Sequence, residues 1–165
     1  MTENILARLF EHNHWANLQL IEVCSALSDE QLDAEPESAT KGSIRLTLWH
    51  LMDTQQMYLS QLTSMEPGFD WQAPTNFAEL LESANKSGEG LVALARDETS
   101  QSLQTKIQDD GYSIEPWVVM VAAISHAAEH REQIKSMFSA LGVTPPRLDG
   151  GAYGMVVNAV IPIST

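Results

Sequence analysis

Apolar residues recur at helical spacing in four long stretches of the chain. Ile5, Leu9 and Leu20 share one face of the first stretch, and Leu48 and Leu51 share one face of the second. The four stretches cover residues 3–27, 43–65, 76–97 and, from Ser113 or Glu115, a last segment to Leu141. The pattern predicts an all-α fold, a four-helix bundle, in a single domain that spans residues 1–165.

Polar and turn-forming residues mark the expected helix ends. Ser28 with Gln31, and Asn76 with Glu79, have the spacing of capping boxes. Gly142, with prolines beyond it, is a typical stop for the last helix. These signals place a short extra helical turn after the first helix and fix the start of the third.

The segments between the helices are read from their composition. Residues 33–42 and 66–75 are expected to be loops, since both contain proline and glycine. A short strand or hairpin is expected around Asp110-Gly111, ahead of the last helix. The apolar tail at 155–163 predicts an extended segment that packs on the bundle or on a partner.

Two of the predicted helices have unusual apolar patterns. Gly88 and Gly90 each cost the third helix about 1 kcal/mol relative to alanine, which predicts a weak middle. Residues 117–124 are apolar on every side and are expected to be buried on every side. With the tail, they exceed what one bundle needs to bury, so we expect a homodimer.

Two histidines interrupt the apolar stripe of the last helix. His126 and His130 lie on the same face as Ala123, Ile134 and Met137. Four residues apart on a helix, the two imidazoles lie about 6 Å from one another at Cβ. A core-facing imidazole must find hydrogen bonds or a cation, and this spacing suits two ligands of one metal ion.

Other polar side chains also fall on or near apolar faces. His50 lies on the flank of the second helix. It is either a structural histidine with its hydrogen bonds satisfied or a third ligand of the metal ion, and the helical pattern leaves both alternatives open. Asn13 and Asn17 lie on the apolar face of the first helix, as structural amides or as part of a polar pocket. His12 and His14 are expected at the solvated surface of that helix.

The charge of the chain restricts its partners. The 165 residues carry a net charge of −13 with no run of basic residues, which argues against binding to nucleic acid or to an anionic membrane. Cys24 is the single cysteine, so no internal disulfide forms and a reducing compartment fits. The N-terminus does not read as a secretory signal, and residues 117–124 are too few to span a bilayer. We therefore expect a cytoplasmic protein.

Four short motifs spread along nearly the whole chain form a joint pattern. They are Trp15-Ala16-Asn17; Gly42-Ser43-Ile44-Arg45 leading into Leu48-Trp49-His50-Leu51; His126 to His130 followed by Arg131 and Gln133; and Leu141-Gly142 before Pro145-Pro146 and Leu148-Asp149. In this order they resemble the DinB-like (DNA-damage-inducible-B-like) family of four-helix bundles, also called YfiT-like metal-dependent hydrolases.

The resemblance implies a metal site. The histidine triad of the family corresponds here to His50, His126 and His130. Three neutral imidazoles leave a divalent ion such as Zn²⁺, Ni²⁺, Fe²⁺ or Mn²⁺ with open positions. The implied activity is transfer or isomerisation that depends on a low-molecular-weight thiol cofactor, or hydrolysis by an activated water. A metal- or ligand-binding stress protein without catalytic activity is the alternative.

A small-molecule substrate or thiol would need further contacts. Arg45 and Arg131 are the candidate groups for the carboxylates of a thiol cofactor, and Asn13 and Asn17 are candidates for other polar contacts.

A second motif overlaps the histidine pair. His126-Ala-Ala-Glu129-His130 has the order of inverted zinc proteases, in which the glutamate is the general base. The only later glutamate, Glu132, lies on the same helix, so the protease interpretation is disfavoured. Glu129 and Asp53, each three residues from a candidate ligand, are candidates for contact with the ion or its ligands.

Overall fold

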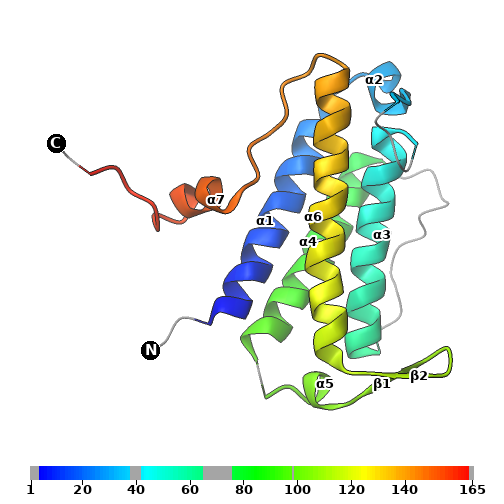
Figure 1. Cartoon of the computed structure of the whole chain (residues 1–165), viewed down its shortest axis with the longest axis vertical. Coiled ribbons are helices and arrows are strands. Elements are labelled where there is room, and N and C mark those ends of the chain that lie inside the picture. Colours follow the sequence, from blue (N-terminus) through cyan, green and yellow to red (C-terminus); the bar gives the residue numbers. More distant parts are fainter. Residues whose placement is uncertain (1–3, 38–41, 65–75, 98, 164–165) are drawn as a thin grey trace.

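The computed structural model describes residues 4–37, 42–64, 76–97 and 99–163, and its four long helices form a bundle (Figure 1). These helices are α1 (Ile5–Ser25), α3 (Ile44–Thr63), α4 (Phe77–Arg96) and α6 (Pro116–Ala140). The shorter elements are α2 (Asp29–Asp33), α5 (Gln101–Gln104), α7 (Gly150–Val156) and a hairpin of β1 (Ile107–Asp109) and β2 (Tyr112–Ile114). The predicted helical bundle and hairpin are confirmed.

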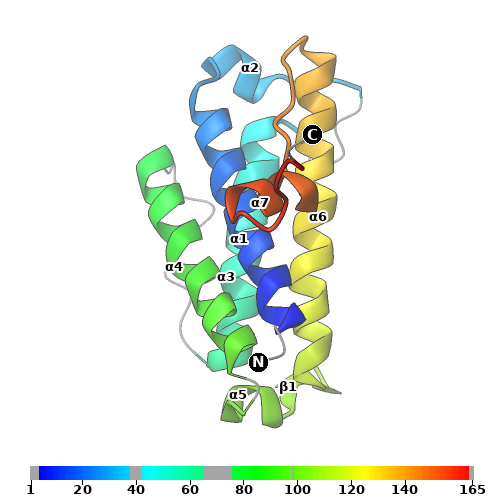
Figure 2. The same cartoon turned by 90° about the vertical axis from the view of Figure 1, so that its left-hand side faces the viewer.

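Each long helix packs mainly against two of the others. α1 contacts α4 and α6, and α3 contacts the same two helices. α1 and α6 run in one direction, whereas α3 and α4 run in the opposite one (Figures 1 and 2). α3 and α6, the second and fourth long helices of the sequence, lie side by side. A site shared by His50 of α3 and His126 of α6 requires this contact.

The expected local signals are present. Ser28 and Gln31 form a complete capping box at α2, and the Asn76 side chain accepts a hydrogen bond from the Glu79 backbone at 2.9 Å. Asp110 and Gly111 both have positive φ, 44° and 80°, which is the backbone of a tight hairpin turn. The predicted loop at 66–75 lies outside the described residues.

The interior consists of two apolar clusters. One contains Leu20, Leu48 and Phe138, and the other contains Phe10 and Leu91. Buried polar residues lie at or near the boundary between the two clusters on each long helix; among them are Asn13 and Asn17 of α1, Gln55 of α3, Ser87 of α4, and His130 and Arg131 of α6. We call Asn13, Asn17, Gln55, Ser87 and Arg131 the polar layer.

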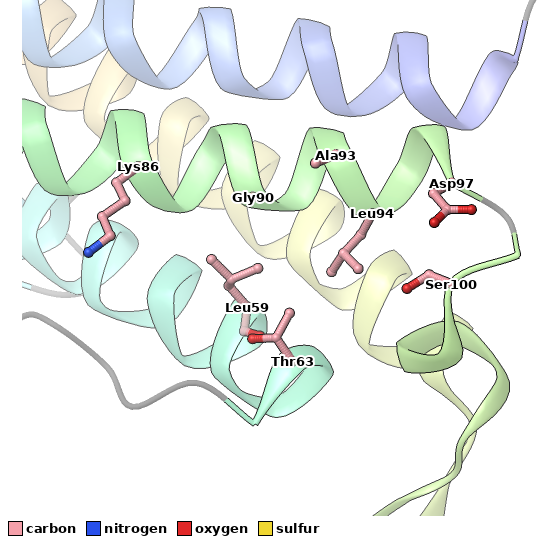
Figure 3. Close-up of a pocket in the computed structure, with 8 residues that line it drawn as sticks. All are labelled: Leu59, Thr63, Lys86, Gly90, Ala93, Leu94, Asp97 and Ser100. Carbon is pink, nitrogen blue, oxygen red and sulfur yellow. The ribbon is translucent and has the colours of Figure 1, made fainter.

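The two glycines of α4 face side chains of neighbouring helices, and α4 continues unbroken through both. A Cβ at Gly88 would lie 2.0 Å from Nδ1 of His14, and one at Gly90 would lie 2.7 Å from a methyl carbon of Leu59. Figure 3 shows Leu59 facing α4 beside Gly90 in a groove of about 350 Å³. The glycines thus allow close packing, a role that composition alone does not reveal.

Three expectations about apolar residues are wrong. Residues 117–124 are not buried on every side, because Trp117 is 65% exposed and Val121 is 58% exposed. Ile5 and Leu9 are also exposed, since the buried face of α1 runs through Phe10 instead. The tail is not wholly extended either, because α7 ends at Val156 and so includes its first two residues.

No helix in the described part of the chain is long and apolar enough to cross a membrane.

Candidate metal centre

Three histidines from two helices converge at the interface of α3 and α6. His126 Nε2 lies 3.1 Å from His50 Nε2 and 3.0 Å from His130 Nε2. One ligand atom from each of the three lies within 4.8 Å of the others. His126 and His130 meet because one helical turn separates them, and His50 reaches them from the neighbouring α3.

The spacing of the ring nitrogens and the hydrogen-bond partner of His130 both fit a bound cation. Bonds of about 2.0 Å to a tetrahedral zinc ion place neighbouring ligand nitrogens about 3.3 Å apart, close to the 3.1 and 3.0 Å between His126 Nε2 and the other two nitrogens. Nδ1 of His130 lies 2.7 Å from Oε1 of Gln133. Because an amide oxygen can only accept, this contact favours the tautomer with the proton on Nδ1, which leaves the Nε2 lone pair facing Nε2 of His126 at 3.0 Å.

The cluster has a buried side and an open side. His130 is only 4% exposed, whereas His50 and His126 are half-buried. The half-buried Tyr58 ring meets His126 edge-on at 5.9 Å between ring centroids. Burial and the negative charge of Glu129 raise the pKa of Tyr58, so its phenol stays protonated at neutral pH. A small molecule approaching from solvent would meet His50, His126 and Tyr58 first.

Gln133→Ala is expected to weaken divalent-metal binding by about 10- to 100-fold, because His130 loses the acceptor that fixes its tautomer. Titration of Zn²⁺ against a competing chelator measures the change. Gln19→Ala, an amide-to-alanine change on α1, is the matched control and should bind Zn²⁺ like the wild type. Unchanged affinity in Gln133→Ala would contradict this role.

Asn13 and Asn17 lie in the core, where they hold Arg131. Nη1 of Arg131 donates to Oδ1 of Asn13 at 2.6 Å and to Oδ1 of Asn17 at 2.7 Å. Asn17 Nδ2 in turn donates to Gln55 Oε1 at 2.7 Å, and Gln55 Nε2 donates to Ser87 Oγ at 2.7 Å. The polar layer therefore joins all four long helices through side-chain hydrogen bonds.

Arg131 is a buried charge at 6% exposure. Burial lowers its pKa to about 10, so the guanidinium remains protonated at neutral pH. No carboxylate of the described residues forms an ion pair with it; the two asparagine oxygens supply its compensation. Its hydrogen bonds are made to Asn13 and Asn17 of α1, not to the histidine cluster at the interface of α3 and α6.

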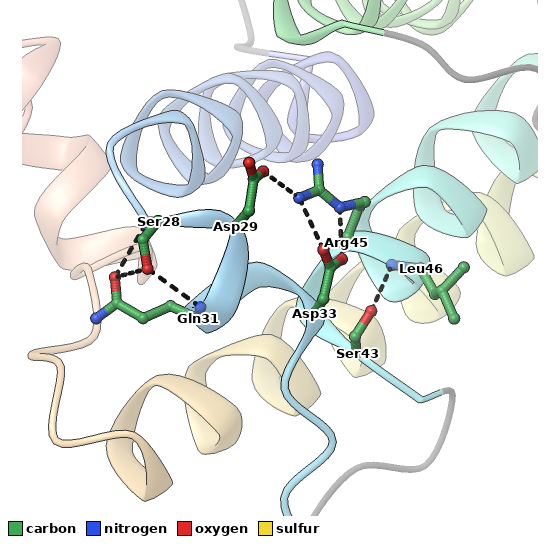
Figure 4. Close-up of polar contacts among 7 residues, drawn as sticks. All are labelled: Ser28, Asp29, Gln31, Asp33, Ser43, Arg45 and Leu46. Carbon is green, nitrogen blue, oxygen red and sulfur yellow. Dashed lines mark hydrogen bonds and ion pairs between the residues drawn. The ribbon is translucent and has the colours of Figure 1, made fainter.

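Arg45 is also engaged elsewhere. Its guanidinium binds Asp33 and Asp29, each at 2.6 Å, at the corner where α2 meets α3 (Figure 4). It lies 5.6 Å from the ring centroid of Trp49. The structure therefore brings the three histidines together, but it ties the Arg45 and Arg131 side chains to other partners.

The sequence pattern did not predict the roles of three residues. They are Gln133 as the hydrogen-bond partner of His130, Tyr58 beside His126, and Gln55 in the polar layer. Gln133 lies one turn after His130, a spacing at which a helical side chain can reach a ligand ring. Tyr58 lies eight residues after His50 and so shares its side of α3. Gln55 gives no such signal, because its partners are distant in sequence.

The comparisons with known proteins agree with this architecture. A model of the DinB family matches residues 1–156 of the 165-residue chain. No curated protein matches the chain.

Proposed function

The chain belongs to the DinB family, and from this premise we propose that His50, His126 and His130 hold one divalent metal ion that serves a reaction on a small molecule. The observation that carries the proposal is the convergence of three imidazole nitrogens, with His126 Nε2 at 3.1 and 3.0 Å from the other two. Zn²⁺, Ni²⁺, Fe²⁺ and Mn²⁺ all accept imidazole ligands.

A divalent ion held there would activate a bound water or a thiol by lowering its pKa. The protein would contribute His130 in a fixed tautomer, the Tyr58 phenol at the open side, and a wall formed by α3 and α6. We propose a metal-dependent transferase or isomerase that uses a low-molecular-weight thiol, or a hydrolase.

The charges near the histidines bear on that choice. Asp53, Glu129 and Glu132 each lie within three residues of a candidate ligand in sequence, and Arg45 and Arg131 are occupied by other partners. This arrangement disfavours a thiol cofactor rich in carboxylates, and it supports water or an uncharged thiol as the activated group.

A Co²⁺-substituted sample separates catalysis from simple metal storage. We expect the visible spectrum of bound Co²⁺ to change when a thiol or a hydrolysable ester is added, because the ligand enters an open coordination position. A spectrum that no such compound alters would favour the alternative, a metal-binding stress protein without catalytic activity.

The exposed apolar side chains support a homodimer. Trp117, Val118 and Val121 lie within one turn of α6 and are all exposed. Val121→Asp is expected to shift the molecular mass measured by light scattering from dimer to monomer, because the new carboxylate would be buried without a partner. Gln101→Asp adds the same charge at an exposed polar site and should remain dimeric. A monomeric wild type at micromolar concentration would contradict the proposal.

The remaining partner and location proposals follow from composition. We propose a cytoplasmic setting, supported by the single cysteine, Cys24, and small-molecule rather than nucleic-acid or membrane partners, supported by the charge of −13. Binding to duplex DNA at physiological salt would overturn the latter.

A further inference from the structure

A second pocket lies away from the histidine cluster, along the seam of α1 and α4. Its volume is about 670 Å³, within the usual range for small-molecule sites. In Figure 2, α7 crosses in front of α1 beside this seam. The lining residues are Glu11, His14, Trp15 and Leu18 of α1, Glu89, Val92, Ala93 and Arg96 of α4, and Tyr153 of α7.

The charges of the pocket are unevenly compensated. Two guanidinium groups share Glu11: its Oε1 accepts from Nη2 of Arg96 at 2.7 Å and from Nε at 3.2 Å, and its other oxygen accepts from Arg8 at 2.8 Å. Glu89 accepts a hydrogen bond from the Asn85 amide at 3.2 Å, but no basic side chain of the described residues pairs with it. The lining therefore carries one carboxylate that lacks a cationic partner.

The lining also contains two aromatic rings, those of Trp15 and Tyr153. The Trp15 and Tyr153 rings lie 5.5 Å apart between centroids, and the His12 ring packs against both. His12 Nε2 also lies 2.8 Å from the Leu148 carbonyl oxygen, which holds the segment before α7 in place. Aromatic faces beside an unpaired carboxylate attract organic cations.

His14 completes the lining without adding positive charge. Its ring is half-buried against Gly88, and its Nδ1 is buried with no hydrogen-bond partner. Burial lowers the pKa of the ring, so it is neutral at neutral pH. The expectation that His14 is a solvated surface residue is therefore wrong.

We propose that this pocket binds a small organic monocation with an apolar body, such as an arylalkylamine, with its ammonium group at Glu89 and its apolar part against Trp15 and Tyr153. The Val92, Ala93 and Leu18 side chains supply the apolar floor. The site does not depend on the metal centre, because none of its lining residues is a candidate metal ligand.

The test uses the full chain labelled with ¹⁵N and two probes of the same shape, 2-phenylethylammonium and neutral 2-phenylethanol. We expect the amine to bind at least about threefold more tightly, as an exposed ion pair allows, with amide shifts at the lining residues. Glu89→Gln should remove this preference. Glu82→Gln makes the same charge change at another exposed position of α4 and should retain it.

Two further variants complete the test. Trp15→Leu should weaken binding of both probes, and His130→Ala should leave the preference for the amine intact even if it loses metal. Equal binding of amine and alcohol, a preference that survives Glu89→Gln, or shifts that miss the lining residues would each overturn the proposal.

Discussion

His130→Ala is expected to lose more than about 100-fold in affinity for Zn²⁺ or Co²⁺, and any metal-dependent activity with it. Removing a ligand should exceed the 10- to 100-fold effect typical of losing a hydrogen-bond partner of a ligand. His130 is also the most buried of the three histidines, so water replaces its nitrogen least easily. Metal content by mass spectrometry and the visible spectrum of the Co²⁺-substituted protein measure the loss.

His12→Ala is the matched control, since it removes an imidazole that lies outside the cluster, at the Leu148 carbonyl. It should bind one equivalent of metal, as the wild type should. If His130→Ala also bound one equivalent with unchanged affinity, the triad would not be the metal site. If the variant lost metal but kept the wild-type rate, the metal would not serve the reaction.

Gly88→Ala is expected to lower the free energy of unfolding by about 1–3 kcal/mol, although alanine is the better helix former. The new Cβ would lie 2.0 Å from Nδ1 of His14 and 2.9 Å from its Cγ, so the whole ring must move. Urea denaturation measures the change, with an unchanged slope as evidence that only stability is altered.

The sign of the same substitution should reverse when the ring is absent. In a His14→Ala background, Gly88→Ala should stabilise the protein by up to about 1 kcal/mol, the ordinary gain of alanine over glycine in a helix. A stabilising effect of Gly88→Ala in the wild-type background would contradict the close contact, as would equal effects in both backgrounds.

The sequence pattern predicted the elements whose signals are local. The helix starts at Ser28 and Asn76 and the turn at Asp110-Gly111 depend on neighbouring residues, and all are present. The grouping of His126 with His130 is local as well, since one helical turn joins them. His50 could be placed beside them only through the family resemblance, because nothing near it in sequence specifies which helix it faces.

The sequence pattern did not predict features that depend on residues far apart in the sequence. Ile5 and Leu9 fit an apolar stripe, yet the helices that pack on α1 cover the adjacent face. Gly88 was predicted only to weaken its helix, because its close neighbour, His14, lies on another helix. Arg131 was predicted as a candidate charge for binding a ligand. It binds Asn13 and Asn17 instead, which lie more than 100 residues earlier in the sequence. The single-domain and homodimer expectations stay predictions.

The polar layer also has a direction. A guanidinium can only donate hydrogen bonds, so the asparagine oxygens must face Arg131. The amide nitrogen of Asn17 is then left to donate to the Gln55 oxygen, and the nitrogen of Gln55 to Ser87, whose hydroxyl donates to the Ser83 carbonyl at 2.8 Å. Inverting either amide would set one N–H group against another. One positive charge on α6, next to His130, thereby orders the side-chain dipoles of three other helices into a single relay.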